Sequence, residues 1–217
     1  MTAQTALKAA LREVVGPAAH TAGFKGSGTT WRSSNGLGDW AVVNVQSSSW
    51  NTSESLRCVI NIALAPAPWL EWKRESIGSL PKAINESLGL HRDRLHPAGT
   101  PTGTDGWWEI SSDRDAQVAA SDMVEQLGKR GWPTLTRLLD RQALIDTIRA
   151  GDLGRMKAEH FGVFFARAEA LLIAENGPSP RLEELLDRAS AGAMPSQSEN
   201  AAMFAQWVRA RAAKLKG

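Results

Sequence analysis

The sequence has no tyrosine and only one cysteine, Cys58, among its 217 residues. A single thiol excludes an internal disulfide, which is consistent with a reducing compartment. The first 15 residues contain Glu13 and no continuous apolar run, so we expect no signal peptide. No stretch approaches the roughly 20 apolar residues that a membrane span needs. We therefore expect a soluble, cytoplasmic protein with no membrane partner.

The sequence also lacks a large excess of positive or negative charge, because its 25 Lys and Arg residues nearly balance its 23 Asp and Glu residues. Nucleic-acid-binding proteins usually carry a lopsided count or a dense basic stripe, so this balance does not favour nucleic acid as a partner. Tryptophan, in contrast, is abundant, with nine residues. Its large apolar ring and single N–H donor serve in cores, in interfaces and in stacking platforms, and composition does not choose among these uses.

Alternation of side chains predicts a β-sheet in the first half of the chain. The clearest strand covers residues 56–64, where alternate apolar residues share one face: Leu56, Cys58, Ile60, Ile62 and Leu64. Residues 28–33 and 39–47 predict a hairpin around a Gly-rich turn, and residues 107–111 predict a fourth strand. Residues 91–95 are a candidate for one more short strand. We expect an antiparallel sheet of about four strands.

Helical patterns flank these strands and then dominate the chain. Residues 5–22 predict a helix that Gly16-Pro17 either interrupts or ends, and residues 113–129 predict another. The fold class is therefore α+β, with a sheet domain over residues 1–150 followed by a helical segment over residues 155–217. That segment either stands alone or packs onto the first domain.

Six short motifs follow one another in a recognisable order: Gly23-Phe24-Lys25, Thr29-Thr30-Trp31-Arg32, Val43-Asn44-Val45-Gln46-Ser47, Val59-Ile60-Asn61-Ile62, Arg92-Asp93-Arg94-Leu95 and Asp105-Gly106-Trp107-Trp108. As an ordered set, they resemble a bacterial family known as DUF4304, a domain of unknown function, over about residues 5–150. The resemblance implies an α+β sheet with flanking helices. It implies no activity, cofactor or site residue.

One face of the predicted sheet combines tryptophan, arginine and amide side chains. Opposite the apolar face, Arg57 and Asn61 are expected beside Trp40, Asn44 and Gln46 of the neighbouring strand. Such a face suits recognition, because tryptophan supplies contact area and amides supply both donors and acceptors. In the alternative interpretation, the amides form a satisfied network beneath a covering helix.

Trp107 and Trp108 are adjacent in a predicted strand, so they point to opposite faces. One belongs in the core, and the other is either an exposed anchor or a side chain packed under the helix predicted at residues 113–129. We include Trp108 with the sheet-face residues as a candidate binding residue.

Catalytic and metal-binding motifs are missing. The sequence has no G-x-S-x-G, HExxH or CxxC motif, and His91, Asp93 and His96 do not follow a recurring ligand spacing. Cys58 lies on the apolar face of its strand, where a thiol behaves as a small hydrophobic group. We expect no cofactor and no metal.

These patterns favour a non-enzymatic protein-interaction or regulatory module with a protein partner. Immunity and antitoxin proteins, which neutralise a partner, are one form of such a function. A hydrolase with a site built from Asp105, Glu109, and His91 or His96 is an alternative. Binding of single-stranded nucleic acid through stacked tryptophans is another. The sequence leaves the oligomeric state open.

Overall fold

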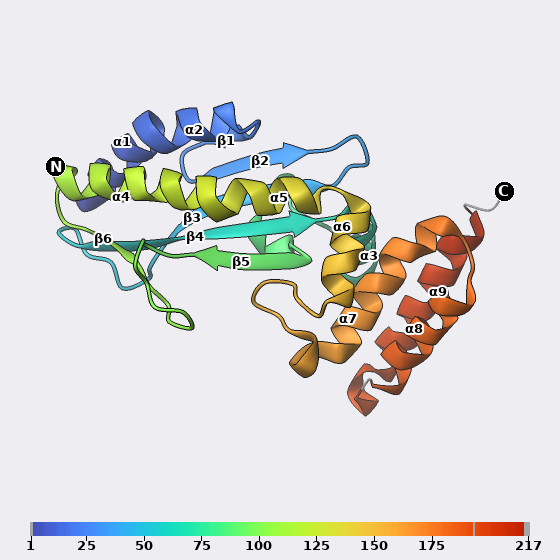
Figure 1. Cartoon of the computed structure of the whole chain (residues 1–217). Coiled ribbons are helices and arrows are strands. Elements are labelled where there is room, and N and C mark those ends of the chain that lie inside the picture. The colour runs from blue at the N-terminus through green and yellow to red at the C-terminus, as the bar shows by residue number, and fades with distance from the viewer. Residues whose placement is uncertain (1, 193, 215–217) are drawn as a thin grey trace.

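Figure 1 shows the computed structural model, which describes residues 2–192 and 194–214. An antiparallel sheet and its covering helices form one half of the molecule, and three C-terminal helices pack at one end. The expected α+β class with a C-terminal helical segment is confirmed. Residues 193 and 215–217 of that segment lie outside the described residues.

The sheet has six strands in the described residues, and every pairing is antiparallel. Five neighbours follow in chain order: β1 (Lys25–Ser27), β2 (Thr30–Ser34), β3 (Trp40–Ser47), β4 (Leu56–Ala65) and β5 (His91–Leu95). The sixth strand, β6 (Trp108–Ile110), pairs with the first residues of β4, while β5 pairs with the later ones. Both therefore lie along one edge of β4, and residues 96–107 form a loop that leaves this edge and returns to it.

Two long helices cover one face of the sheet, and each contains a π-helical turn. The first joins α1 (Ala3–Ala10), η1 (Leu11–Val15) and α2 (Gly16–Thr21). The second joins α4 (Asp113–Gln126), η3 (Leu127–Gly131) and α5 (Trp132–Leu138).

Pro17 and Pro133 each follow such a π turn by two residues. A proline lacks the N–H that a helix uses, and its ring clashes with the carbonyl four residues earlier. The wider turn absorbs this defect, because the Gly16 and Trp132 amides each bond the carbonyl five residues back. The second long helix therefore continues to Leu138, beyond residue 129, where the sequence pattern predicted its end.

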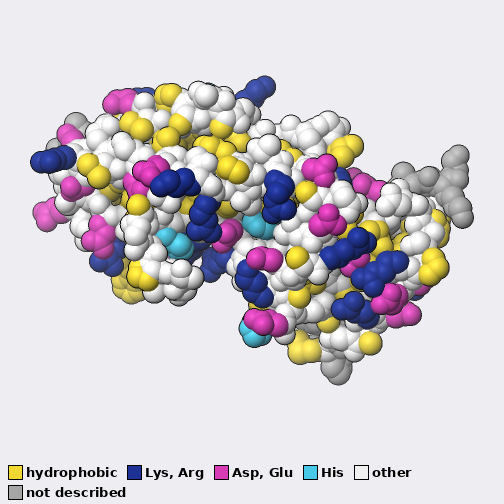
Figure 2. Space-filling view, viewed as in Figure 1, with side chains coloured by type: hydrophobic (Ala, Val, Ile, Leu, Met, Phe, Trp, Pro, Cys, Tyr) yellow, Lys and Arg dark blue, Asp and Glu magenta, His cyan; other side chains and the backbone are white. Residues whose placement is uncertain are grey.

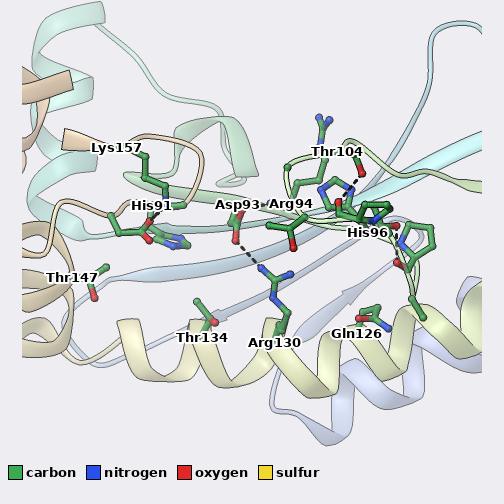
Figure 3. A pocket seen from close by; sticks show the side chains of 18 of the residues that line it. His91, Asp93, Arg94, His96, Thr104, Gln126, Arg130, Thr134, Thr147 and Lys157 are labelled. Atoms are coloured by element: carbon green, nitrogen blue, oxygen red, sulfur yellow. Dashed lines mark hydrogen bonds and ion pairs between the residues drawn. The ribbon is translucent and has the colours of Figure 1, made fainter. Parts of the chain in front are cut away.

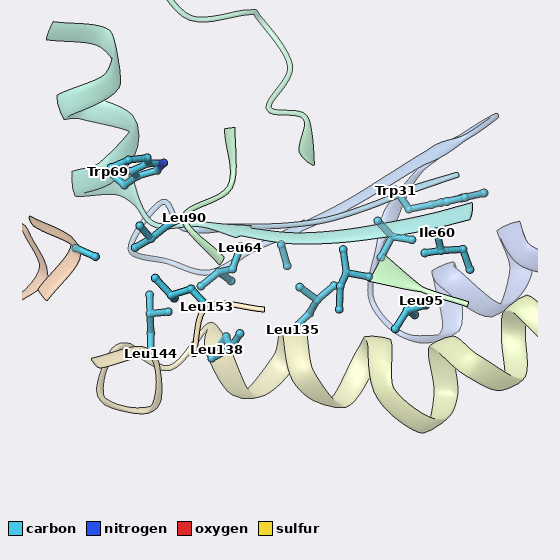
Figure 4. Close-up of a cluster of buried hydrophobic side chains, with 14 of the residues drawn as sticks. Trp31, Ile60, Leu64, Trp69, Leu90, Leu95, Leu135, Leu138, Leu144 and Leu153 are labelled. Atoms are coloured by element: carbon cyan, nitrogen blue, oxygen red, sulfur yellow. The ribbon is translucent and has the colours of Figure 1, made fainter. Parts of the chain in front are cut away.

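The main core lies between these helices and the sheet. Alternate residues of the strands point into it, including Trp31, Ile60, Leu64 and Leu95, and α5 contributes leucines from the other side (Figure 4). At one end, the opposite sheet face is covered by α3 (Ala67–Ile77) and the segment that leads to η2 (Glu86–Leu88). That end holds a small second cluster of apolar residues.

The last helices pack against α3 and α6 (Arg141–Arg149). They are α7 (Ala158–Ile173), η4 (Ala174–Asn176), α8 (Pro180–Ala191), η5 (Pro195–Gln197) and α9 (Ser198–Lys214). The ring centroids of Trp69 and Phe164 are 5.5 Å apart, and those of Trp72 and Phe204 are 5.1 Å apart. One hydrophobic core runs through the sheet half and these helices. No helix among the described residues is long and apolar enough to cross a membrane.

Candidate functional site

A polar cavity lies beside the β5 edge of the sheet, with a volume of about 980 Å³. Its walls are β5, the η3–α5 part of the second long helix, α6, the 96–107 loop, and the segment before α7. Figure 3 shows β5 and the helix facing each other across it. We call it the β5 cavity. Figure 2 shows basic, acidic and histidine side chains intermixed on this face of the molecule.

The register of β5 decides which of its side chains reach the helical side of the sheet. His91 is opposite Leu64 and Asp93 is opposite Ile62, both of which point into the core. Because alternate residues share a face, His91 and Asp93 also point toward the helical layer, and Arg94 points to the other face. At the edge of the sheet this direction leads into the cavity (Figure 3).

The helix contributes a polar stripe. Arg130, Thr134 and Arg137 are spaced by four and three residues, which places them on one side of the helix, and all three line the cavity. Arg137 Nη1 donates a hydrogen bond of 3.0 Å to Thr147 Oγ1 on α6. This bond holds the guanidinium between two helices at the cavity wall.

The segment before α7 closes the rim through backbone bonds to the free edge of β5. The Arg92 amide donates to the Leu153 carbonyl at 3.2 Å, and the Arg155 amide donates to the Arg92 carbonyl at 2.7 Å. Gly154, between them, has φ +77°, and a Cβ there would lie 2.2 Å from the Arg92 carbonyl oxygen. Only glycine fits this close approach.

His91 lines the cavity and has a buried polar atom without a partner in the described part of the chain. It is only 5% exposed, and its Nδ1 atom is buried without a hydrogen-bond partner among the described residues. Burial lowers the pKa of His91, and the nearby Asp93 and Asp152 carboxylates only partly offset this effect. The ring is therefore neutral at pH 7, with one nitrogen that donates and one that accepts.

The sheet-face residues predicted from the sequence lie together. Trp40, Asn44 and Gln46 of β3 share a face with Arg57 and Asn61 of β4, and Asn44 is directly opposite Asn61. Toward the end of this face away from α3, Gln46 and Arg57 are exposed and Asn44 is half-buried, whereas Asn61 is buried.

An internal network uses the amides of this face. Asn61 Nδ2 donates to Gln46 Oε1 at 2.7 Å, and Arg94 Nε donates to Asn61 Oδ1 at 3.3 Å. Arg94 Nη1 in turn bonds the Asp105 carboxylate at 2.8 and 2.9 Å. The amide network of the alternative interpretation is thus present, although it bridges strands and a loop instead of lying under a helix.

The two adjacent tryptophans separate as the strand geometry requires. Trp108 is buried against α4, where its Nε1 donates to Asp122 Oδ2 at 2.8 Å. It is therefore not accessible on the amide-bearing face. Trp107 takes that position, with the Arg94 guanidinium 5.4 Å from its ring centroid.

The residues of the hydrolase alternative are brought together only in part. His96 Nδ1 donates to the Gly106 carbonyl at 2.9 Å and lies 3.8 Å from Asp105, whose carboxylate is bound by Arg94. Glu109 pairs with Arg57 at 2.8 Å on the sheet face, and His91 lies at the opposite end of β5. These groups do not converge on one substrate position.

Three further kinds of site lack support in the described residues. No group of three or more His, Cys, Asp or Glu side chains there could hold a metal ion. Burial raises the pKa of the Cys58 thiol to about 12, so the thiolate nucleophile does not form near pH 7. Of the tryptophans, Trp50 alone is almost fully exposed, at 90%, whereas stacking of successive bases needs several open rings.

The sequence pointed to His91 but missed the cavity. The spacing of Arg130, Thr134 and Arg137 was the available signal, because it marks one polar side of a helix. Nothing in the sequence connects Thr147 and Lys157 to β5, since tertiary packing alone brings them there.

No curated protein and no solved structure matches the chain. The family model of DUF4304, a domain of unknown function, matches residues 15–137, more than half of the chain. The match is shorter than the expected 5–150. It includes β5 and the helix wall of the β5 cavity, and it ends before α6. The chain therefore belongs to the DUF4304 family.

Proposed function

We propose that the chain is a non-enzymatic binding or regulatory module and that the β5 cavity is where it recognises its ligand. The observation that carries this proposal is the buried, unpaired Nδ1 of His91 at the cavity wall. Buried polar atoms in proteins nearly always have a partner, so an unpaired one on a residue that lines a cavity supports a ligand that supplies a missing bond. The volume, about 980 Å³, suits a small molecule.

One observation favours the hydrolase alternative. A neutral imidazole inside a cavity is in the protonation state that a general base needs. Against it, Asp105 and Glu109 are engaged elsewhere by Arg94 and Arg57, so His91 lacks the second group that the alternative assigned to it.

The test exposes the protein to the small-molecule fraction of a cell extract and follows its thermal unfolding. A ligand at 100 times its Kd stabilises by about 2.7 kcal/mol, which raises the Tm of a protein of this size by about 5–10 °C. We expect this rise for the wild type and its loss in His91→Gln and Thr147→Val. Arg12→Gln, an exposed change on η1 remote from the cavity, should retain it.

Mass spectrometry of the retained compound then separates the two functions. A compound recovered unchanged after prolonged incubation supports a binding module, whereas its conversion to a product supports the hydrolase. Equal stabilisation of the wild type and both cavity variants would remove the β5 cavity from consideration, and so would no stabilisation by any fraction.

A further inference from the structure

We infer that the β5 cavity takes a small molecule with a phosphate or carboxylate group, held between His91 of β5 and the Arg130–Thr134–Arg137 stripe of the helix. This inference rests on the proposed function, because it names the chemistry of the ligand for the same site. The polar groups of the cavity differ in whether the protein already supplies their hydrogen-bond partners.

The acidic groups of the cavity are engaged by the protein. Asp93 Oδ1 accepts the Arg94 amide at 2.8 Å, and its Oδ2 lies 3.6 Å from Arg130. Asp152 Oδ1 accepts both the Gly154 amide at 2.8 Å and Lys157 Nζ at 2.7 Å.

The third carboxylate, Asp146, accepts a bond of 2.8 Å from Gln142 Nε2 on the same helix. Each acidic side chain of the wall therefore has at least one protein donor. These carboxylates would therefore gain less from hydrogen bonds donated by a ligand.

The cavity side chains that can still form hydrogen bonds are donors. Within residues 2–192 and 194–214, no carboxylate lies within 4.0 Å of Arg137, and its single side-chain hydrogen bond is the one to Thr147. The hydroxyl of Thr134 makes no hydrogen bond to these residues, and Arg130 has only the long contact to Asp93. A guanidinium carries five N–H groups in a plane, a geometry that matches the two oxygens of a carboxylate or phosphate.

These donors lie across the cavity from His91. In Figure 3, Arg130 and Thr134 project from the helix toward β5, while His91 and Asp93 project from the strand. An oxyanion between them would accept from guanidinium, hydroxyl and one imidazole nitrogen. The His91 ring makes no hydrogen bond to the described residues, so a bound oxyanion would supply a partner that the ring lacks.

Ligand binding would also change the ionisation of His91. The charged groups that face its ring are Asp93 on β5, Asp152 and Lys157 on the rim, and Arg137 on α5. Their effects oppose one another, and burial keeps the pKa low. An added negative charge beside the ring favours the imidazolium form, so binding of the anion should raise this pKa and take up a proton.

The experiment uses the imidazole NMR signals of the full chain, which has only four histidines. Pyrophosphate and citrate are titrated separately at constant ionic strength, with glucose as the neutral probe. We expect a saturable shift of the His91 signals and a higher His91 pKa with at least one anion. The signals of His20, which lies on α2 away from the cavity, should not move. The anion that binds identifies the preferred group, phosphate or carboxylate.

Variants test the placement of the anion. Arg137→Gln should weaken binding by about tenfold or more, as expected for loss of a charge-assisted hydrogen bond. Arg12→Gln removes the same charge from an exposed site and should leave the affinity unchanged. Equal weakening by both variants, or no His91 response to either anion, would overturn the inference. If neutral compounds from the extract still bind at the cavity, the proposed function survives that result.

Discussion

Asp39 shows how a single buried carboxylate joins the sheet to the C-terminal helices. It is 1% exposed and accepts bonds of 2.6 Å from both Nε and Nη2 of Arg141. Arg141 Nη1 also donates to Glu175 at 2.6 Å. Burial by itself raises the pKa of Asp39, but hydrogen bonds from Arg141, the Ala67 amide and Asn35, together with the Arg141 charge, hold it below its ordinary value.

Removing one partner of this pair should be costly. Arg141→Met leaves a buried carboxylate without its cation, which typically destabilises a protein by about 3–5 kcal/mol. Urea unfolding at pH 7 measures this loss. The matched change Arg209→Met breaks an exposed pair with Glu183 and should cost at most about 1 kcal/mol. Similar costs for the two variants would contradict the role assigned to Asp39.

The same pair predicts a dependence on pH. Because the folded pKa of Asp39 lies below the unfolded one, its contribution is fully present above the unfolded value of about 4 and is lost as pH falls through the folded pKa. Unfolding free energies of wild type and Asp39→Asn should therefore converge as the pH is lowered below 4.

At the scale of elements, the rim of the β5 cavity depends on one glycine. Gly154→Ala introduces both a left-handed residue and a contact of 2.2 Å with the Arg92 carbonyl. The strain alone costs about 1–2 kcal/mol, and the clash adds to it. Gly99→Ala is the matched control, because Gly99 has the same φ of +77° and no atom within 4 Å of a Cβ. Gly154→Ala should be clearly less stable than Gly99→Ala in urea unfolding, and equal stability would show that the clash is relieved.

Elements whose pattern comes from one buried face were predictable. β4 was predictable because its apolar side chains alternate with a period of two residues. In the structure, the register between β4 and β3 places Asn44 opposite Asn61. β1 was missed because its three residues are all exposed, so no apolar alternation marks it. The sequence left open whether the first helix ends at Gly16-Pro17, and its pattern ended the second near residue 129. A π turn before Pro17 and another before Pro133 let both helices continue. The cavity unites residues from five parts of the chain, and no local pattern encodes that meeting.

For the whole molecule, the aromatic contacts between α3 and α9 join the two halves, and we expect these halves to unfold as one cooperative unit. Trp72 contacts both Phe204 and Trp207, with ring centroids 5.1 and 5.7 Å apart. Arg211 forms ion pairs with Glu71 on α3 and Glu175 after α7. Because one core runs through both halves, neither is expected to unfold alone.

Phe204→Ala tests this cooperativity. The buried ring leaves a cavity whose cost is about 3–5 kcal/mol, and amide hydrogen exchange should show faster opening of β4 as well as of α9. Met203→Ala, at a neighbouring position that is 45% exposed, should change stability by at most about 0.5 kcal/mol. Retention of wild-type protection in β4 by the Phe204 variant would mean that the sheet half is stable without the last helix.

The loop over residues 96–107 leaves β5 and re-enters the sheet as β6, and both strands are paired to β4. Its two ends are thus anchored whatever its length or composition, while its middle forms a wall of the β5 cavity. Lengthening an anchored surface loop costs little free energy. Insertions and deletions here would change the shape of the β5 cavity while the scaffold stays intact.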